Sequence, residues 1–146
     1  MMKKFLVAIV AIIAIAITAN AGETFSRDAS VLPKAAQTIL ADNFKAKVSM
    51  IKIDKDFGRV SEYEVILTDG SEVTFDHNGN WKEVEVSLKN SVPSFFVPKS
   101  VSEYIKKTHS GQKIVGIEKN RSDYEVELTN GIDLKFNNQG QFLKYD

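Results

Sequence analysis

The sequence predicts an α+β protein made of two tandem repeats, each with one helix packed on a four-stranded antiparallel meander. Three observations predict this class. One segment recurs further along the chain, with its turn glycines and aromatic residues in the same places. Each copy opens with a proline that is followed by apolar residues at helical spacing. Short segments of alternating polar and apolar residues then follow, separated by turn dipeptides.

The repeat is clearest when residues 62–81 are aligned with residues 123–142 without a gap. Upstream, Pro33 matches Pro98, and the second copy is shorter where it replaces the turn at 56–61. Identity that falls on core positions and turn glycines indicates internal duplication. The identical pairs include Tyr63/Tyr124, Glu64/Glu125, Val65/Val126, Leu67/Leu128, Gly70/Gly131, Phe75/Phe136 and Gly79/Gly140.

A short helix is expected at the start of each copy. Proline is well suited to the first turn of a helix, where its missing N–H has no partner to lose. After Pro33 the apolar residues Ala36, Ile39 and Leu40 keep helical spacing, as do Val101, Tyr104 and Ile105 after Pro98. Helices this short need a surface to pack on.

Four strands are expected after each helix. The alternation is clearest in 62–68, where Tyr63, Val65 and Leu67 share one face. Asp69-Gly70 and Asn78-Gly79 supply the positive φ angles that tight hairpin turns require. One face of each sheet should carry the helix, and the other should meet water or a partner. Whether the two sheets join is left open. The expected strands are 49–55, 62–68, 72–76 and 81–86, then 114–119, 123–129, 132–137 and 142–145.

The chain is predicted to be exported. Lys3 and Lys4, an apolar run from Phe5 to Ile17 and an Ala-x-Ala end at Ala21 form the three parts of a secretory signal peptide. That run is shorter than the roughly 20 residues that span a bilayer. We therefore expect residues 1–21 to be removed and the protein to be periplasmic or secreted, with no membrane attachment. The organisation that follows is a flexible arm at 22–31, repeat one at 32–86, a linker at 87–96 and repeat two at 97–146.

Composition and motifs argue against an enzyme. The absence of cysteine excludes disulfides, thiol catalysis and thiolate metal sites. The formal net charge of +0 gives no electrostatic footprint for nucleic acid. His77 and His109 stand apart and are interpreted as surface residues. The segment from Asp76 to Asn80 resembles the start of a calcium loop, but a hairpin turn explains it better. No cofactor and no metal site is predicted.

Candidate binding residues come from the places where the copies differ, and from exposed aromatics. Ile66 lies on the outward face of its strand where the second copy has Glu127. Trp81, the only tryptophan, is either an interface anchor or a core residue, since Phe142 replaces it. Phe95 and Phe96 either pack between the repeats or line a groove there. Glu64 and Glu125 represent the acidic outward faces, on which carboxylates and lysines alternate.

Residues 65–84 resemble the PepSY-like, β-lactamase-inhibitor-like family. Together with Tyr63 they keep the family's spacing, in which Val65, Leu67 and Gly70 are followed by Phe75-Asp76, Gly79 and Trp81. The second copy fits more loosely, because Asn137 replaces the aspartate and Phe142 the tryptophan. The resemblance implies secreted bacterial proteins, often with tandem repeats, that lack an established enzymatic activity. The family name further implies protein-inhibitor relatives that offer one sheet face to a target enzyme. The resemblance defines no site residues.

The function we expect from the sequence is that of a periplasmic binding or inhibitory module. It would act on a protein partner, such as a peptidase or another envelope enzyme, through its open sheet face. The alternative is binding of a small ligand or peptide in a groove between the repeats. The oligomeric state is not predicted.

Overall fold

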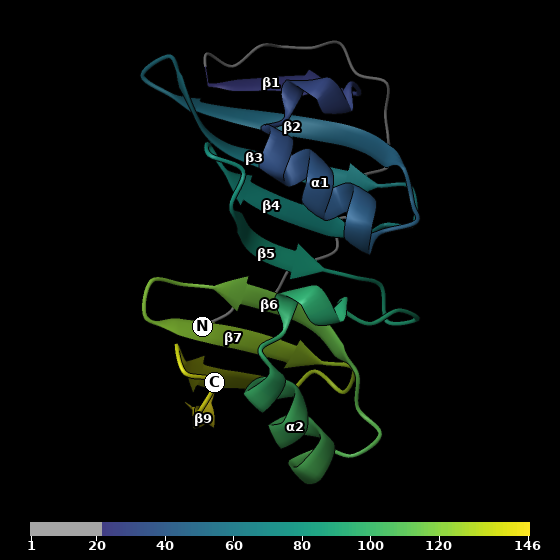
Figure 1. Cartoon of the computed structure of the whole chain (residues 1–146), viewed down its shortest axis with the longest axis vertical. Coiled ribbons are helices and arrows are strands. Elements are labelled where there is room, and N and C mark those ends of the chain that lie inside the picture. The colour runs from purple at the N-terminus through teal and green to yellow at the C-terminus, as the bar shows by residue number, and fades with distance from the viewer. Residues whose placement is uncertain (1–21) are drawn as a thin grey trace.

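The computed structural model describes residues 22–146, in which nine strands form a single antiparallel sheet. The strands lie side by side in chain order, from β1 at one edge to β9 at the other (Figure 1). The predicted signal peptide, residues 1–21, lies outside the described residues. The strands are β1 (Glu23–Ser26), β2 (Val48–Asp56), β3 (Arg59–Leu67), β4 (Glu72–Asp76), β5 (Trp81–Glu85), β6 (Ile114–Lys119), β7 (Asp123–Leu128), β8 (Asp133–Asn137) and β9 (Phe142–Tyr145).

The predicted fold class is confirmed: a helix followed by four antiparallel strands occurs twice. Helix α1 (Lys34–Asn43) precedes β2–β5, and α2 (Lys99–Thr108) precedes β6–β9. A 3₁₀ turn stands before each helix, η1 (Ala29–Val31) and η2 (Ser94–Phe96). The two four-stranded units join into one sheet, because β5 pairs with β6 and places Val84 opposite Ile117.

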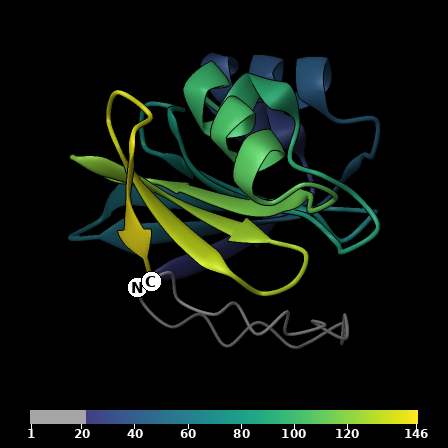
Figure 2. The ribbon, with the colours of Figure 1, turned by 90° about the horizontal axis from the view of Figure 1, so that it is seen from below.

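Both helices cover the same face of the sheet (Figure 2). Alternation along the strands turns one set of side chains toward the helices, and that set forms the hydrophobic core. Helix α1 buries Ala36 and Leu40 against it, and α2 buries Val101 and Ile105. The fully buried strand residues include Ile51, Val65, Val73, Phe75, Val84, Ile117, Val126, Leu134 and Phe136. Among residues 22–146 no helix lies on the opposite face, and we call it the open face.

Gly79 shows why the β4–β5 turn needs glycine for two reasons. Its φ is +87°, a backbone conformation that is strained for any residue with a side chain. A Cβ at this position would also lie 2.9 Å from Pro33 Cβ and 3.1 Å from the backbone nitrogen of Ala36. The turn therefore packs directly beneath the first turn of α1, which fixes the position of the helix on the sheet.

The expectation of a flexible arm at 22–31 is wrong. Residues Glu23–Ser26 form β1, which pairs antiparallel with β2 and places Phe25 opposite Lys52. Asp28 then caps η1, since its carboxylate accepts a hydrogen bond from the Ser30 N–H at 2.9 Å. The arm is polar and too short to show a period, so its order comes from backbone pairing with β2, which leaves little signal in the sequence.

The linker at 87–96 is held to the fold in its middle and at its C-terminal end. The Val92 N–H donates to the Ile114 carbonyl at 2.8 Å, beside the β5–β6 junction. At the C-terminal end η2 turns Phe96 into the core, where it is 1% exposed. Within residues 22–146, no helix has the length and apolar character needed to cross a membrane.

Candidate functional site: the open sheet face

The open face is acidic along most of its width. The same alternation that buries the core points the other half of the strand residues away from the helices. Lys52, Lys82 and Lys135 are interspersed among the acids of this face. The acidic members are Asp54, Glu62, Glu64, Glu72, Glu83, Glu85, Glu118, Asp123, Glu125, Glu127 and Asp133.

Carboxylates stand directly opposite one another where the two repeats meet. Glu72 pairs with Glu85 across β4 and β5, and Glu83 pairs with Glu118 across β5 and β6. Like charges in opposed positions of a sheet destabilise it. We call these four residues the junction acids. Their arrangement does not stabilise the sheet.

The surroundings of the junction acids raise their pKa values. Burial raises the pKa of Glu83 to about 8, and the neighbouring charges of Glu118 and Glu85 add to the effect. Burial and the charge of Glu72 raise the pKa of Glu85 to about 7. Within residues 22–146, one carboxylate oxygen of Glu83, Oε1, is buried without a hydrogen-bond partner. A cationic group that reached this row would reduce the repulsion between the carboxylates and would give Glu83 Oε1 a partner.

Lysines pair with the acids on either side of the junction. Lys52 Nζ lies 3.1 Å from Glu64 Oε2 and 3.7 Å from Asp54 Oδ1. Burial opposes the charge of Lys52, but the hydrogen bond and charge of Glu64 outweigh it and raise the pKa of the ammonium above its ordinary value. In the second repeat Lys135 Nζ lies 3.7 Å from Glu125 Oε1. Lysines therefore balance the acids on either side of the junction, and the junction acids form the most acidic part of the face.

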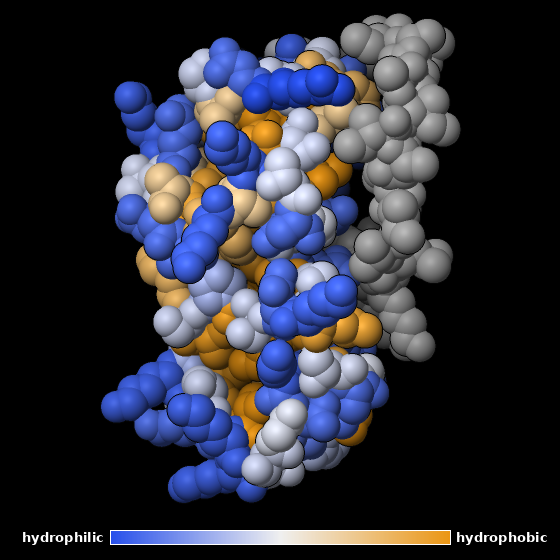
Figure 3. All heavy atoms as spheres, turned by 90° about the vertical axis from the view of Figure 1, so that its right-hand side faces the viewer, coloured by the Kyte–Doolittle hydropathy of each residue, from blue (hydrophilic) through white to orange (hydrophobic). Residues whose placement is uncertain are grey.

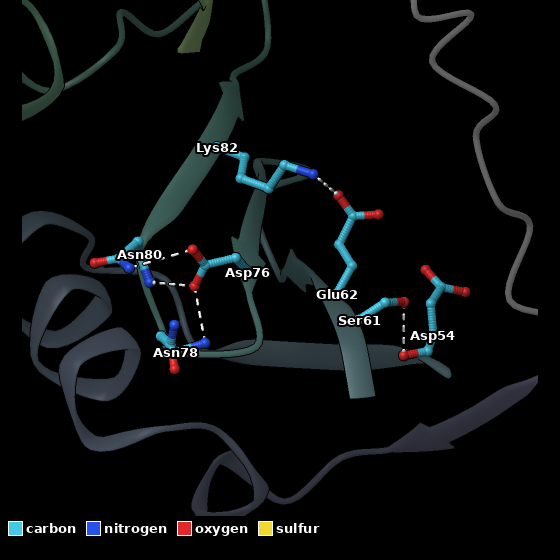
Figure 4. Close-up of polar contacts among 7 residues, drawn as sticks. All are labelled: Asp54, Ser61, Glu62, Asp76, Asn78, Asn80 and Lys82. Carbon is cyan, nitrogen blue, oxygen red and sulfur yellow. Dashed lines mark hydrogen bonds and ion pairs between the residues drawn. The ribbon is translucent and has the colours of Figure 1, made fainter. Parts of the chain in front are cut away.

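Three carboxylates of β2 and β3 converge on the open face. Asp54, Glu62 and Glu64 each place one oxygen within 4.8 Å of the others, a spacing suited to a cation. The Lys52 ammonium already contacts two of them, and Lys82 Nζ lies 3.1 Å from Glu62 Oε1 (Figure 4). Each of the three carboxylates is thus already paired with a lysine ammonium group. No local sequence pattern marks this cluster, because it forms only when β2 and β3 pair in register.

Asp76 holds the β4–β5 hairpin turn (Figure 4). Its Oδ1 accepts hydrogen bonds from the backbone N–H groups of Asn78 at 2.8 Å and Asn80 at 2.9 Å. Burial opposes ionisation of Asp76, but the hydrogen bonds from Asn80 and Asn78 outweigh it and lower its pKa. Asn137 makes the same two backbone contacts in the second repeat, with Gln139 and Gln141. The hairpin-turn interpretation of this segment accounts for both copies.

The predicted binding residues do not form one patch. Ile66 lies on the open face between Met50 and Glu72 and is half-buried. Trp81 lies on the other face, opposite Phe75, and its ring packs on Phe96. Phe96 is buried, so it contributes to the junction between the repeats and is closed to a partner.

The remaining predicted residues divide in the same way. Phe95 is 56% exposed beside Phe96, on the linker. Glu64 and Glu125 occupy equivalent positions of the open face in the two repeats. Glu64 is half-buried in its pair with Lys52, and Glu125 is buried close to Lys135. The open face therefore holds Ile66, Glu64 and Glu125, whereas the predicted aromatic residues Trp81, Phe95 and Phe96 lie on the helix side.

Two exposed aromatic residues were missed from the sequence. Phe25 lies on the open face at the β1 edge and is 46% exposed. Phe57 stands fully exposed at the tip of the β2–β3 hairpin, with a positive φ of 51°. A non-glycine residue in this conformation is uncommon and worth noting. The only sequence signal for Phe57 as an exposed residue was that it is apolar and lies inside the predicted turn at 56–61.

A shallow depression of about 450 Å³ lies where the repeats meet, at the end of α1 and the linker. Lys45, Lys89 and Lys113 line it, together with Asp69 and the buried Ser71. These segments belong to the side of the molecule seen in Figure 3, where hydrophilic side chains break up the apolar surface. The depression is open and carries more positive than negative charge.

The fold and this face define a class: tandem α+β repeats that share one sheet, with both helices of the described residues on the same face. A family model described as putative beta-lactamase-inhibitor-like, PepSY-like matches residues 61–144, and the chain belongs to this family. No curated protein matches the chain.

Solved structures of similar proteins share the architecture. A putative periplasmic protein of unknown function from Bacteroides vulgatus is 40% identical, covers 86% of this chain and 99% of its own, and superposes with a TM-score of 0.80. A putative calcium-regulated periplasmic protein from Bacteroides thetaiotaomicron is 33% identical, with 85% and 96% coverage and a TM-score of 0.77. A third, a putative periplasmic protein of the DUF2874 family from Bacteroides vulgatus, is 33% identical, with the same coverage and a TM-score of 0.76.

Proposed function

We propose that this chain is a periplasmic binding module that holds a protein partner on its open face. The observation that carries the proposal is the row of junction acids, in which Glu72 faces Glu85 and Glu83 faces Glu118. Opposed like charges reduce the stability of the sheet, whereas a basic partner surface would turn them into favourable contacts. The descriptions of the relatives as periplasmic, together with the predicted signal peptide, support the compartment.

The proposed partner presents lysine or arginine side chains to the centre of the face. Arginine is especially suited, because its planar guanidinium contacts carboxylates in pairs. Phe25 and Ile66 add apolar contact area on the same face. The inhibitor-like description of the family favours an envelope enzyme, such as a peptidase or β-lactamase, as this partner.

Capture from envelope extract tests the proposal. The mature chain is used as bait beside a variant carrying Glu83→Lys and Glu85→Lys. The control variant is Glu103→Lys, a charge reversal on the exposed surface of α2, away from the open face. We expect a partner that the wild type and the control retain and that the double variant and high salt release.

Two results contradict the proposal. The first is that no protein is enriched by the wild type over the double variant. The second is that a partner is captured equally by all three baits. Activity of the captured enzyme, measured with and without the module, then separates inhibition from simple binding.

A second candidate is binding of a small anionic ligand in the depression between the repeats. The lysines at 45, 89 and 113 favour carboxylate or phosphate groups there. A ligand that binds the native state raises the melting temperature. A thermal-shift screen of anionic metabolites and acidic peptides tests this, with Lys89→Ala and Lys113→Ala as the variants that should lose the response.

A further inference from the structure

The contact between the two repeats is a defined interface within the chain. Strand β6 pairs with β5, and η2 places Phe96 over the end of the first repeat. The Phe96 ring lies 5.2 Å from that of Trp81 and 5.8 Å from that of Phe44, measured between centroids. The second repeat thus closes the first by adding a strand and inserting one aromatic side chain.

The second repeat carries an equivalent receiving surface at its own outer end. His109 and Phe142 stand at the positions of Phe44 and Trp81, because each pair follows its helix and opens its last strand. Tyr145 lies beside them, 5.8 Å from the His109 ring and 5.0 Å from the Phe142 ring. Within residues 22–146, the outer edge of β9 pairs with no strand. Tyr145 is accordingly 54% exposed, whereas the equivalent Val84 is fully buried.

The other end of the molecule carries the matching inserting surface. Strand β1 lies on β2 as β5 lies on β6: Ser26 faces Ile51 where Val84 faces the equivalent Ile117. The four-residue strand β1 therefore occupies the place on β2 that the last strand of a preceding repeat would take. In the turn that follows, Val31 is the counterpart of Phe96, and it is 38% exposed.

We propose that the chain assembles head to tail, with β9 of one copy replacing β1 on β2 of the next. Val31 of the second copy then packs on His109 and Phe142, as Phe96 packs on Phe44 and Trp81. Repeat proteins build arrays through such nearest-neighbour interfaces and need caps to end them. In this assembly β1 is the cap, and its release exposes the edge of β2 for pairing with the next copy.

The geometry of β9 supports acceptance of a strand. A bulge interrupts its pairing with β8 between Lys135 and Phe136, and bulges at an edge usually discourage association. Strand β5 has the equivalent bulge opposite Thr74 and Phe75 of β4, and it still pairs with β6. The residues that pair lie beyond the bulge in both strands.

Strand β9 replaces the backbone pairing with β2 that is lost on displacement of β1. The side chains of β1 make one ion pair with β2, between Glu23 Oε1 and Lys52 Nζ at 3.3 Å, and pairs at such exposed positions contribute little. Strand β9 offers Tyr145 on the core side where β1 offers Ser26, so replacement buries more apolar surface. The interface is heterologous and does not close on itself, so copies would form open chains.

Engineered cysteines test the assembly in a chain that has none of its own. In the proposed pairing Lys144 of one copy faces Lys52 of the next, as Glu83 faces Glu118. The full mature chain is made with Lys52→Cys and Lys144→Cys, and β1 is weakened by Thr24→Pro, which removes a backbone donor. Within one copy the two positions are seven strand spacings apart, roughly 30 Å, so they cannot bond to each other.

We expect a ladder of disulfide-linked oligomers after mild oxidation, in at least tenfold greater yield than with the control Thr24→Ala, which keeps the backbone donor. The pair Glu83→Cys and Glu118→Cys should form its bond within one chain and remain monomeric. A Thr24→Pro chain that melts cooperatively yet stays monomeric after oxidation overturns the proposal. If Thr24→Pro does not fold, Phe25→Gly weakens β1 more gently, and the same outcomes decide.

Discussion

Phe96 packs edge-on against Trp81, with ring centroids 5.2 Å apart and planes at 87°, and thereby joins the segment between the repeats to the last strand of the first repeat. The neighbouring Phe95 points outward and is 56% exposed. Two adjacent phenylalanines therefore have opposite roles. The consequences for stability can be measured separately, and they show how far the two repeats depend on each other.

Phe96→Ala should lower the free energy of unfolding by about 3–5 kcal/mol, because it empties a buried aromatic site. Phe95→Ala should cost less than about 1 kcal/mol, since it removes only an exposed ring. Urea denaturation followed by tryptophan fluorescence reports on both, because Trp81 lies in the contact. Equal losses for the two variants would contradict the assigned packing.

Gly79→Ala should be more harmful than Gly70→Ala. Both glycines have a φ of +87°, so alanine at either place is strained by about 1–2 kcal/mol. At Gly79 a Cβ also meets Pro33 at 2.9 Å, whereas at Gly70 nothing lies within 4 Å. Displacing α1 adds about 1–3 kcal/mol. Thermal melting of the two variants measures the difference, and similar melting temperatures would show that the turn does not hold the helix.

Asp76→Asn should leave stability within about 0.5 kcal/mol, whereas Asp76→Ala should cost about 1–2 kcal/mol. The reason is that the side chain serves as an acceptor for two backbone N–H groups, and Asn137 performs the same role as an amide. Denaturant titration measures both. A large loss with asparagine would mean that the charge of Asp76, and not its hydrogen bonding, is what the turn requires.

Stability should fall as the pH rises toward 8, and Glu83→Gln should reduce that fall. The pKa of Glu83 is raised to about 8 from an ordinary value of 4.5, so the folded chain keeps a proton that the unfolded chain has released. Between these values the unfolded state binds fewer protons, and the free energy of unfolding therefore decreases with pH. Denaturation at several pH values checks this. Glu103→Gln on α2 is the control and should keep the full pH dependence of the wild type.

Calcium should leave the melting temperature of the wild type unchanged and should raise that of Lys52→Met. The Lys52 ammonium contacts Glu64 and Asp54, two of the three carboxylates that converge on the open face. Its removal leaves a negative site of hard oxygen ligands, which suits Ca²⁺. Thermal shift with and without CaCl₂ decides. A response of the wild type that Glu64→Gln abolishes would show that the ion displaces the lysine.

The repeat, the two helices and eight of the nine strands were predictable because each leaves a local pattern. Tyr63, Val65 and Leu67 alternate, and the glycines at 70 and 79 mark turns that the structure places at positive φ. Strand β1 was not predictable, because a four-residue edge strand held by backbone pairing has no hydrophobic period of its own. Phe57 was missed for a related reason, since a turn residue is expected to be polar.

The candidate site was less accessible to sequence reasoning than the fold. The outward acids could be recognised one strand at a time, but which of them oppose one another depends on register between strands. Trp81 and Ile66 were grouped as possible anchors, yet they project from opposite faces, since alternation and a bulge between Thr74 and Phe75 set their directions.

The sequence alone determined the duplication, the α+β class, the turns and the division of each strand into a core side and a polar side. Those features follow from local spacing, which period and glycine conformation reveal directly. Tertiary structure alone decided that the two sheets are one, that β1 occupies the place of a missing strand, and that Glu83 faces Glu118. These depend on pairings between segments far apart in the chain, whose register is set by the packing of the whole core.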